Sequence, residues 1–64
     1  MKFNEFVKVK TLVKKNNVKI GEIGIIIVAL EKPTEGYIVE FCNDEDYEPW
    51  ATETYFPNEI ELVK

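Results

Sequence analysis

The sequence predicts a single small all-β domain that spans residues 1–64. Two observations favour this fold class. Apolar and polar residues alternate over several short stretches, a period of two that is typical of half-buried strands. Nowhere do apolar residues recur at the spacing of an amphipathic helix over three turns. The chain is also close to the smallest size at which one hydrophobic core offsets the conformational entropy of folding, so we expect one domain.

The first half of the chain predicts two strands. Residues 6–13 alternate apolar or threonine side chains with lysines, until the polar segment 14–17 interrupts the pattern. We expect Gly21 and Gly24 to turn the chain before the next strand, because glycine adopts turn conformations without steric cost. Residues 25–30 are almost wholly apolar and mostly β-branched, a composition that packs well on a pleated sheet. This segment is the predicted second strand.

A third strand follows a loop whose proline and glycine mark residues 31–36. Residues 37–42 alternate again, and the period of two places Tyr37, Val39 and Phe41 on one face. These three large side chains are therefore candidates for the core.

The C-terminal part predicts two more strands around a short turn. After an acidic turn at residues 43–46, residues 47–55 are rich in aromatic residues and threonine, but Pro49 cannot donate to a ladder and so marks an edge or a bulge. Residues 57–60 are typical of a single 3₁₀ turn, and residues 61–63 form a short closing strand. Five short strands with a 3₁₀ turn before the last predict a small, mostly antiparallel barrel, and we expect the five-stranded SH3-like type.

The residue types exclude most catalytic chemistry. Histidine is absent, which removes histidine triads, histidine metal sites and histidine general bases. The lone thiol of Cys42 is expected to pack as a small hydrophobe in a reducing compartment. The pair Gly21 and Gly24 lacks the Lys-Ser/Thr of a phosphate loop. We therefore expect no catalytic residues, no metal ligands, no cofactor and no enzymatic activity.

The net charge of −4 conceals two oppositely charged segments. Residues 1–20 contain six lysines and one glutamate, a balance of +5, and residues 35–61 contain nine acids and no lysine, a balance of −9. Such a separation creates fields that steer partners. Pairing of the two segments across neighbouring strands is the alternative interpretation.

The acidic segment contains the predicted binding surface. Aromatic side chains among charges are typical of a protein-binding hot spot. The candidate partner-binding residues are Glu40, Asp44, Glu45, Asp46, Tyr47, Glu48, Trp50 and Glu53. Trp50 is also a candidate for the core, and if alternation continues through Pro49, Trp50 and Tyr47 lie on opposite faces. The acids at 44–48 lack the spacing of a calcium loop, so a solvated turn is favoured over a metal site.

Three segments together resemble a known family: residues 21–24 followed by an aliphatic strand, residues 36–41, and residues 57–62. They resemble short acidic bacterial proteins of unknown function with SH3-like barrels, some encoded near polymorphic toxins, and the resemblance covers residues 6–63. It implies a small cytoplasmic protein-binding module, in its most concrete form an immunity or antitoxin-like protein that neutralises a basic toxin domain. Its partner would then be a basic protein.

A weaker likeness to KOW-type barrels gives the alternative, a nucleic-acid or ribosome-associated module. The lysines of residues 8–19 could form the basic patch that this function needs. The nine acids would repel the same phosphate backbone, however, so we expect nucleic-acid binding to be absent or weak. The two functions differ in whether lysines or acids surround the exposed aromatic side chains.

The second predicted strand has more apolar surface than a barrel of this size normally leaves to solvent. Ile25 and Val28 are therefore a candidate apolar interface, either with a partner or with a second copy of the chain. We expect no membrane association and a cytoplasmic location, because residues 1–5 contain no apolar run and residues 25–30 are too few to cross a bilayer.

Overall fold

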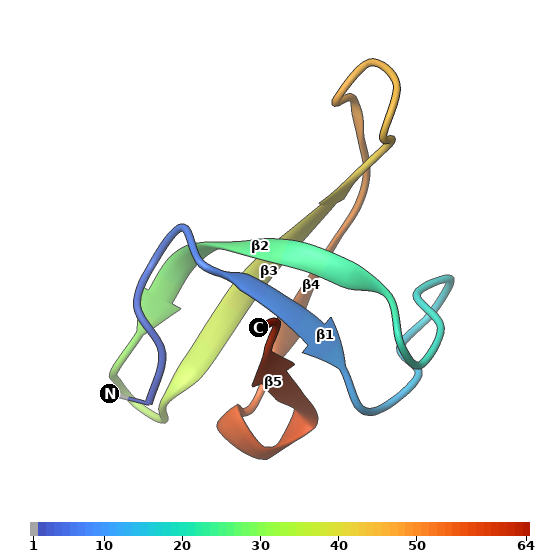
Figure 1. The fold of residues 1–64 in the computed structure, drawn as a ribbon. Coiled ribbons are helices and arrows are strands. Elements are labelled where there is room, and N and C mark those ends of the chain that lie inside the picture. The colour runs from blue at the N-terminus through green and yellow to red at the C-terminus, as the bar shows by residue number, and fades with distance from the viewer. Residues whose placement is uncertain (1) are drawn as a thin grey trace.

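Figure 1 shows the fold of the chain, a computed structural model that describes residues 2–64. Its elements are β1 (Lys8–Thr11), β2 (Ile23–Leu30), β3 (Gly36–Cys42), β4 (Pro49–Tyr55), the 3₁₀ turn η1 (Pro57–Glu59) and β5 (Ile60–Leu62). The predicted all-β class is confirmed for these residues. Met1, with which the predicted domain begins, lies outside the described residues. Within residues 2–64 no helix is long and apolar enough to span a membrane.

The strands form one antiparallel sheet in the order β4-β3-β2-β1-β5. Strands β1 to β4 follow one another as a meander, and β5 returns to pair with β1, which places Val9 opposite Leu62. The sheet is bent, so that β1 and β2 run in a different direction from β3 and β4 (Figure 1). No ladder joins β4 to β5 within residues 2–64, so both are edge strands.

The two glycines before the aliphatic strand have different roles. Gly21 turns the chain with a φ of +91°, a conformation that favours glycine. The expectation that Gly24 also turns the chain is wrong, because Gly24 lies inside β2, where it pairs with Val9 of β1. Gly24 is buried, and β3 passes directly over it.

Two irregularities interrupt the ladders. In β2 the register shifts between Ile26 and Val28 opposite β3. In β4, Pro49 and Ala51 face consecutive residues of β3, so that Trp50 between them is an extra residue. The bulge or edge that Pro49 predicted is therefore present, and it interrupts the strict alternation at the start of β4.

The core lies on the face of the sheet that the alternation in residues 37–42 predicted. Its fully or nearly fully buried apolar side chains are Phe3, Val9, Val18, Ile26, Tyr37, Val39, Phe41, Tyr55 and Ile60. Phe3 comes from the segment before β1, and the sequence pattern did not predict its burial. The Tyr37 hydroxyl holds this segment, because it accepts hydrogen bonds from the backbone N–H groups of Lys2 and Phe3, both at 3.0 Å.

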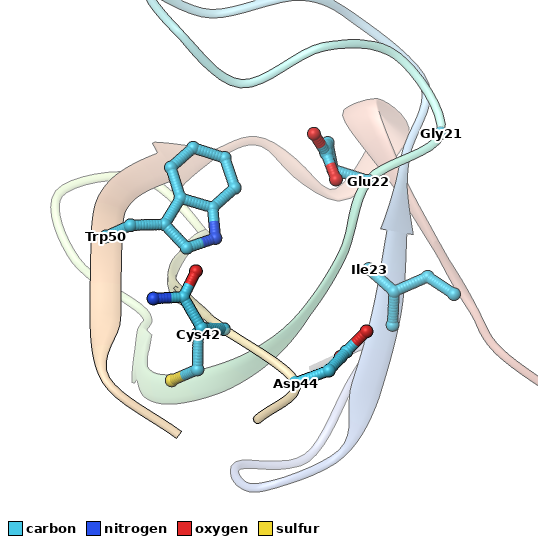
Figure 2. Close-up of a pocket in the computed structure, with 7 residues that line it drawn as sticks. Gly21, Glu22, Ile23, Cys42, Asp44 and Trp50 are labelled. Atoms are coloured by element: carbon cyan, nitrogen blue, oxygen red, sulfur yellow. The ribbon is translucent and has the colours of Figure 1, made fainter. Parts of the chain in front are cut away.

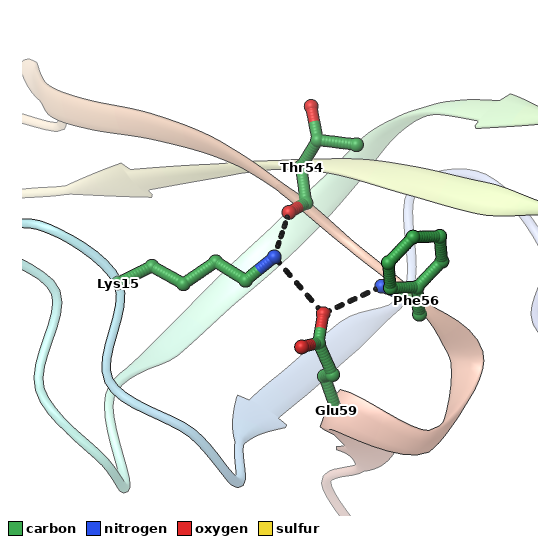
Figure 3. Close-up of polar contacts among 4 residues, drawn as sticks. All are labelled: Lys15, Thr54, Phe56 and Glu59. Atoms are coloured by element: carbon green, nitrogen blue, oxygen red, sulfur yellow. Dashed lines mark hydrogen bonds and ion pairs between the residues drawn. The ribbon is translucent and has the colours of Figure 1, made fainter.

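Two ion pairs connect the lysine-rich segment to the acidic segment. Lys10 pairs with Glu61 across β1 and β5 at 3.3 Å, and Lys15 pairs with Glu59 at 3.0 Å. Lys15 Nζ also donates to the Thr54 carbonyl oxygen at 2.8 Å (Figure 3). Pairing between the two segments is thus a real feature of the fold. It involves acids near the C-terminus, outside the acidic turn at residues 43–46.

Candidate partner-binding surface

The loop between β3 and β4, residues 43–48, projects away from the rest of the sheet (Figure 1). It is closed by backbone hydrogen bonds from Asn43 N–H to the Glu48 carbonyl at 2.9 Å and from Tyr47 N–H to the Asn43 carbonyl at 3.0 Å. Glu48 N–H donates to Asp46 Oδ1 at 3.0 Å. The side chains of the loop therefore stand on a backbone held by hydrogen bonds, which Asp46 itself helps to shape.

Tyr47 has an unusual conformation in this loop. Its φ is +57°, which disfavours residues with a Cβ atom, and 79% of its surface is exposed. A large aromatic residue in this position is unfavourable for folding on both counts. Such local cost is typical of residues that serve a binding function.

The acids of the loop have no basic partners within residues 2–64. Both ion pairs found within residues 2–64 involve other acids, Glu59 and Glu61. The unpaired acids are Asp44, Glu45, Asp46 and Glu48, all of them exposed. The loop therefore presents concentrated negative charge to solvent.

A groove of about 310 Å³ lies between this loop and the outer face of β2. Tyr47 lines it from the loop, and Ile23 and Ile25 line it from β2. Lys8 and Glu40, which flank Ile25 in the ladders, add one charge of each sign. The groove combines the predicted apolar interface at Ile25 with the predicted acidic and aromatic residues.

A second cleft of about 490 Å³ lies on the other side of Ile23 (Figure 2). Gly21 and Glu22 form one wall, and Trp50 and the start of the β3–β4 loop form the other. Trp50 is 41% exposed and packs against Phe41, with 5.8 Å between the ring centroids. Trp50 therefore lies at the surface and not in the core.

The two cavities adjoin, because they share Ile23, Asp44 and two neighbouring residues of β3 and the loop. Together they define one continuous surface over the start of β2, the end of β3 and the loop. Ile23 is 53% exposed and stands between them as an apolar ridge.

Not every predicted residue belongs to this surface. Glu53 lies on β4 and accepts a hydrogen bond from the Asn16 side chain at 2.8 Å, so it contacts the β1–β2 loop instead. Val28 is half-buried, lies opposite Ile38, and lines neither cavity. Glu45, Asp46 and Glu48 lie on the loop beside the cavities without lining them.

Ile23 and Glu22 also line this surface, and the sequence pattern did not indicate them. Ile23 and Ile25 flank Gly24, so a strand that begins at Ile23 places both on the same face. Because Gly24 was expected to turn the chain, the strand was not expected to begin at Ile23. Glu22 belongs to the loop before β2, and only the tertiary fold brings it close to Trp50.

Cys42 lines both cavities, but its thiol is not activated. Its Sγ lies 3.6 Å from Glu40 Oε1. Burial raises the pKa of the Cys42 thiol, and the nearby carboxylates of Glu40 and Asp46 raise it further. A protonated thiol is a poor nucleophile. Within residues 2–64 no group of three or more histidine, cysteine or acidic side chains is placed to hold a metal ion.

No protein-family model matches the chain, and no curated protein or solved structure matches it. The fold and the surface described above define the chain as a small antiparallel β-sheet domain with a projecting acidic loop beside an apolar groove.

Proposed function

We propose that the chain is a non-catalytic protein-binding domain whose binding surface is the β3–β4 loop together with the groove beside it. The observation that carries the proposal is the position of Tyr47. This exposed aromatic side chain lines a groove with two exposed isoleucines and is surrounded by acids that have no partner in the described chain. Aromatic and aliphatic anchors inside a charged rim are the usual anatomy of a protein interface.

The charge of the surface indicates the kind of partner. Four unpaired acids in the loop attract a basic protein and accelerate its association. The resemblance described above extends this proposal to a bacterial immunity or antitoxin-like protein that acts in the cytoplasm on a basic toxin domain. Tyr47 lies on the acidic loop and Trp50 lies beside it, and Lys10 and Lys15 are engaged in ion pairs. This arrangement favours a protein partner over nucleic acid.

We further propose that the sheet is an SH3-like barrel. Three features support this architecture: the strand order β4-β3-β2-β1-β5, the antiparallel pairing of β1 with β5, and a 3₁₀ turn directly before β5. Contacts between β4 and β5 in an NMR structure would test the closure.

Binding kinetics test the proposed surface. After a partner has been isolated on the immobilised chain and identified, its binding is measured by surface plasmon resonance over a range of salt concentrations. Replacing Asp44, Glu45 and Asp46 with Asn, Gln and Asn should slow association and flatten its salt dependence, because rim charges act mainly on encounter. Tyr47→Asn should accelerate dissociation instead. Asparagine tolerates a positive φ, so the fold should be unchanged.

Glu31→Gln is the matched control, since Glu31 is an exposed acid that lines neither the groove nor the cleft. It should leave both rates unchanged. Unchanged association of the triple variant at every salt concentration would show that the loop is merely a solvated turn. Submicromolar binding to RNA or DNA that weakens steeply with salt would instead favour the KOW-like function.

A further inference from the structure

We propose that the cleft beside Trp50 is a binding site for a guanidinium group, and that the partner places an arginine side chain there. The inference rests on the proposed protein-binding function and specifies the chemistry that this part of the surface recognises. Four observations carry it: the walls of the cleft, the rigidity of one wall, its unneutralised charge, and its position next to the apolar groove.

The walls of the cleft suit a planar cation. Glu22 and Asp44 contribute carboxylates from two separate segments, and Trp50 contributes an indole ring. Figure 2 shows Trp50 on the β4 side of the opening, Glu22 and Ile23 on the opposite side, and Asp44 at the start of the β3–β4 loop. Carboxylates accept paired hydrogen bonds from a guanidinium, and an aromatic ring attracts the same cation.

The wall that carries Glu22 is held in place by Thr11. This residue is fully buried, its hydroxyl donates to the Lys19 carbonyl at 2.7 Å, and it accepts a hydrogen bond from Glu22 N–H at 3.2 Å. Thr11 N–H also donates to the Glu22 carbonyl at 3.0 Å. The Glu22 backbone is therefore fixed before a ligand arrives, which lowers the entropic cost of binding.

No positively charged side chain among residues 2–64 lines the cleft. No lysine lines it, and neither Glu22 nor Asp44 takes part in an ion pair within residues 2–64. The raised pKa of Cys42, which burial and then Glu40 and Asp46 cause, also reflects negative surroundings. The 64 residues contain eight lysines and no arginine, so a guanidinium must come from outside these residues.

Arginine fits this cleft better than lysine or a metal ion. Guanidinium is planar, more weakly hydrated than ammonium, and able to contact an aromatic face while it bonds to carboxylates in its plane. A divalent cation would need more oxygen ligands than two carboxylates supply. No such group of three acids exists among residues 2–64.

The neighbouring groove makes the site more specific. Because Ile23 and Asp44 line both cavities, an arginine in the cleft stands next to whatever side chain occupies the groove. The surface therefore recognises a basic segment that presents an arginine beside an apolar residue.

The test uses the isolated chain and two small probes, so it needs no partner. The ¹⁵N-labelled chain is titrated with N-acetyl-arginine amide and, separately, with N-acetyl-lysine amide. We expect saturable shifts of the Trp50 indole N–H and of the Gly21 and Asp44 backbone N–H signals with the arginine probe. The lysine probe should bind more weakly at the same signals. Equal binding of both probes, or the absence of saturable shifts at these positions, would overturn the proposal.

Single substitutions distinguish a specific guanidinium site from general electrostatic attraction to the acidic loop. Glu22→Gln and Asp44→Asn should each weaken arginine binding roughly two- to fivefold, the effect of losing a partly exposed ion pair. Glu45→Gln removes an equal charge from the same loop outside the cleft and should change the affinity less. An equal loss for Glu45→Gln would mean that only the general field of the loop attracts the probe. Trp50→Leu should abolish the difference between the arginine and lysine probes.

The two proposals can fail separately. Tyr47→Asn alters the groove and should leave arginine binding unchanged, although it accelerates dissociation of the partner. If the partner binds and the arginine probe does not, the guanidinium site is wrong and the protein-binding function stands. If the probe saturates the cleft and the triple acidic variant, which lacks the Asp44 carboxylate, binds the partner normally, the cleft binds guanidinium but the partner places no arginine there, and the proposed docking surface is wrong.

Discussion

At Gly24 the backbone of β2 passes so close to β3 that no larger residue fits without movement. A Cβ atom there would lie 2.7 Å from Val39 Cγ1, 2.8 Å from the Glu40 carbonyl oxygen and 2.8 Å from Phe41 Cδ1. Two of these three neighbours are core side chains and the third is backbone. Gly36, at the start of β3, is different, because its nearest neighbour would be 3.7 Å away.

We therefore expect Gly24→Ala to lower the free energy of unfolding by about 1–3 kcal/mol, the usual cost of overpacking. Gly36→Ala serves as the control and should leave stability unchanged or slightly higher, since alanine loses less backbone entropy than glycine on folding. Urea denaturation of both variants measures the difference. Equal stabilities for the two variants would contradict the close approach of β2 to β3.

The contrast between Gly21 and Gly24 shows what a local pattern leaves undetermined. Both glycines precede or begin an aliphatic run, and both were expected to turn the chain. One of them has a positive φ, and the other has extended backbone that makes room for a neighbouring strand. A close approach depends on a strand that lies fifteen or more residues later in the sequence, so no local pattern encodes it.

Among the elements, the β1–β2 loop is fastened to the end of β4 and to η1 by Lys15. Its Nζ donates to the Thr54 carbonyl at 2.8 Å, pairs with Glu59 Oε1 at 3.0 Å, and lies 5.0 Å from the Tyr55 ring centroid. The same Glu59 oxygen accepts the Phe56 N–H at 2.9 Å (Figure 3). One lysine thus joins three elements.

Lys15→Met should lower the free energy of unfolding by roughly 1–2 kcal/mol, because it removes a charged hydrogen bond and a partly buried ion pair while it keeps the aliphatic stem. Lys10→Met is the matched control. Lys10 makes only the 3.3 Å pair with Glu61, and both side chains are about half exposed. We expect the free energy of unfolding of Lys10→Met to be nearly unchanged. Thermal or urea denaturation measures both, and similar losses for the two variants would contradict the role of Lys15.

The element that sequence patterns described least well is β4. Alternation predicts the direction of a side chain only while each residue of a strand faces one residue of the neighbouring strand. Trp50 is an extra residue between Pro49 and Ala51, so its side-chain direction does not follow from its position in the run. For this reason the sequence pattern did not decide whether Trp50 lies in the core or at the surface. The structure places it at the surface, packed on Phe41.

At the scale of the whole molecule, ionisable side chains limit stability at both ends of the pH range. The Phe56 backbone N–H, and then Lys15, lower the pKa of Glu59 from its usual 4.5, and the Tyr37 hydroxyl does the same for Glu35. These carboxylates therefore stabilise the fold fully above pH 4.5, and that contribution is lost as the pH falls through their lower folded pKa values.

On the alkaline side, burial raises the pKa of Tyr55 from 10 to about 12. The folded state then keeps a proton that the unfolded state releases, so the free energy of unfolding should fall as the pH rises from 10 to about 12. Urea denaturation at a series of pH values measures the loss of stability at both ends of the pH range, the acid and the alkaline limb of the stability curve. Glu59→Gln should make the free energy of unfolding depend less on pH in the acid limb.

Tyr55→Phe should flatten the alkaline limb. It should also keep or raise stability at neutral pH, because the buried Tyr55 hydroxyl has no hydrogen-bond partner within residues 2–64. An unchanged alkaline limb in this variant would show that other groups, such as Tyr37, cause the loss.

Much of the fold and part of the surface could be predicted because they depend on contiguous residues. Strands β1 and β3 follow from a period of two, β2 follows from its run of β-branched residues, and the acidic loop is a continuous run of charges between two strands. The groove and the cleft could not be predicted, because they arise from register: Ile25 lies opposite Glu40, and Glu22 reaches the level of Trp50 only after β2 has paired with β3. The docking of Lys2 and Phe3 on the Tyr37 hydroxyl is likewise a contact between distant residues.

The pairing of β1 with β5, which sets Val9 opposite Leu62, also fixes an order of events during synthesis. A ribosome delivers the chain from its N-terminus, so β1 to β4 are all available before the strand that covers the outer edge of β1. That edge keeps unpaired backbone groups until residues 60–62 have emerged, and its pairing then requires closure of a loop that runs from Val9 to Leu62. A chain interrupted before residue 60 would offer the open edge of β1 to any other strand nearby.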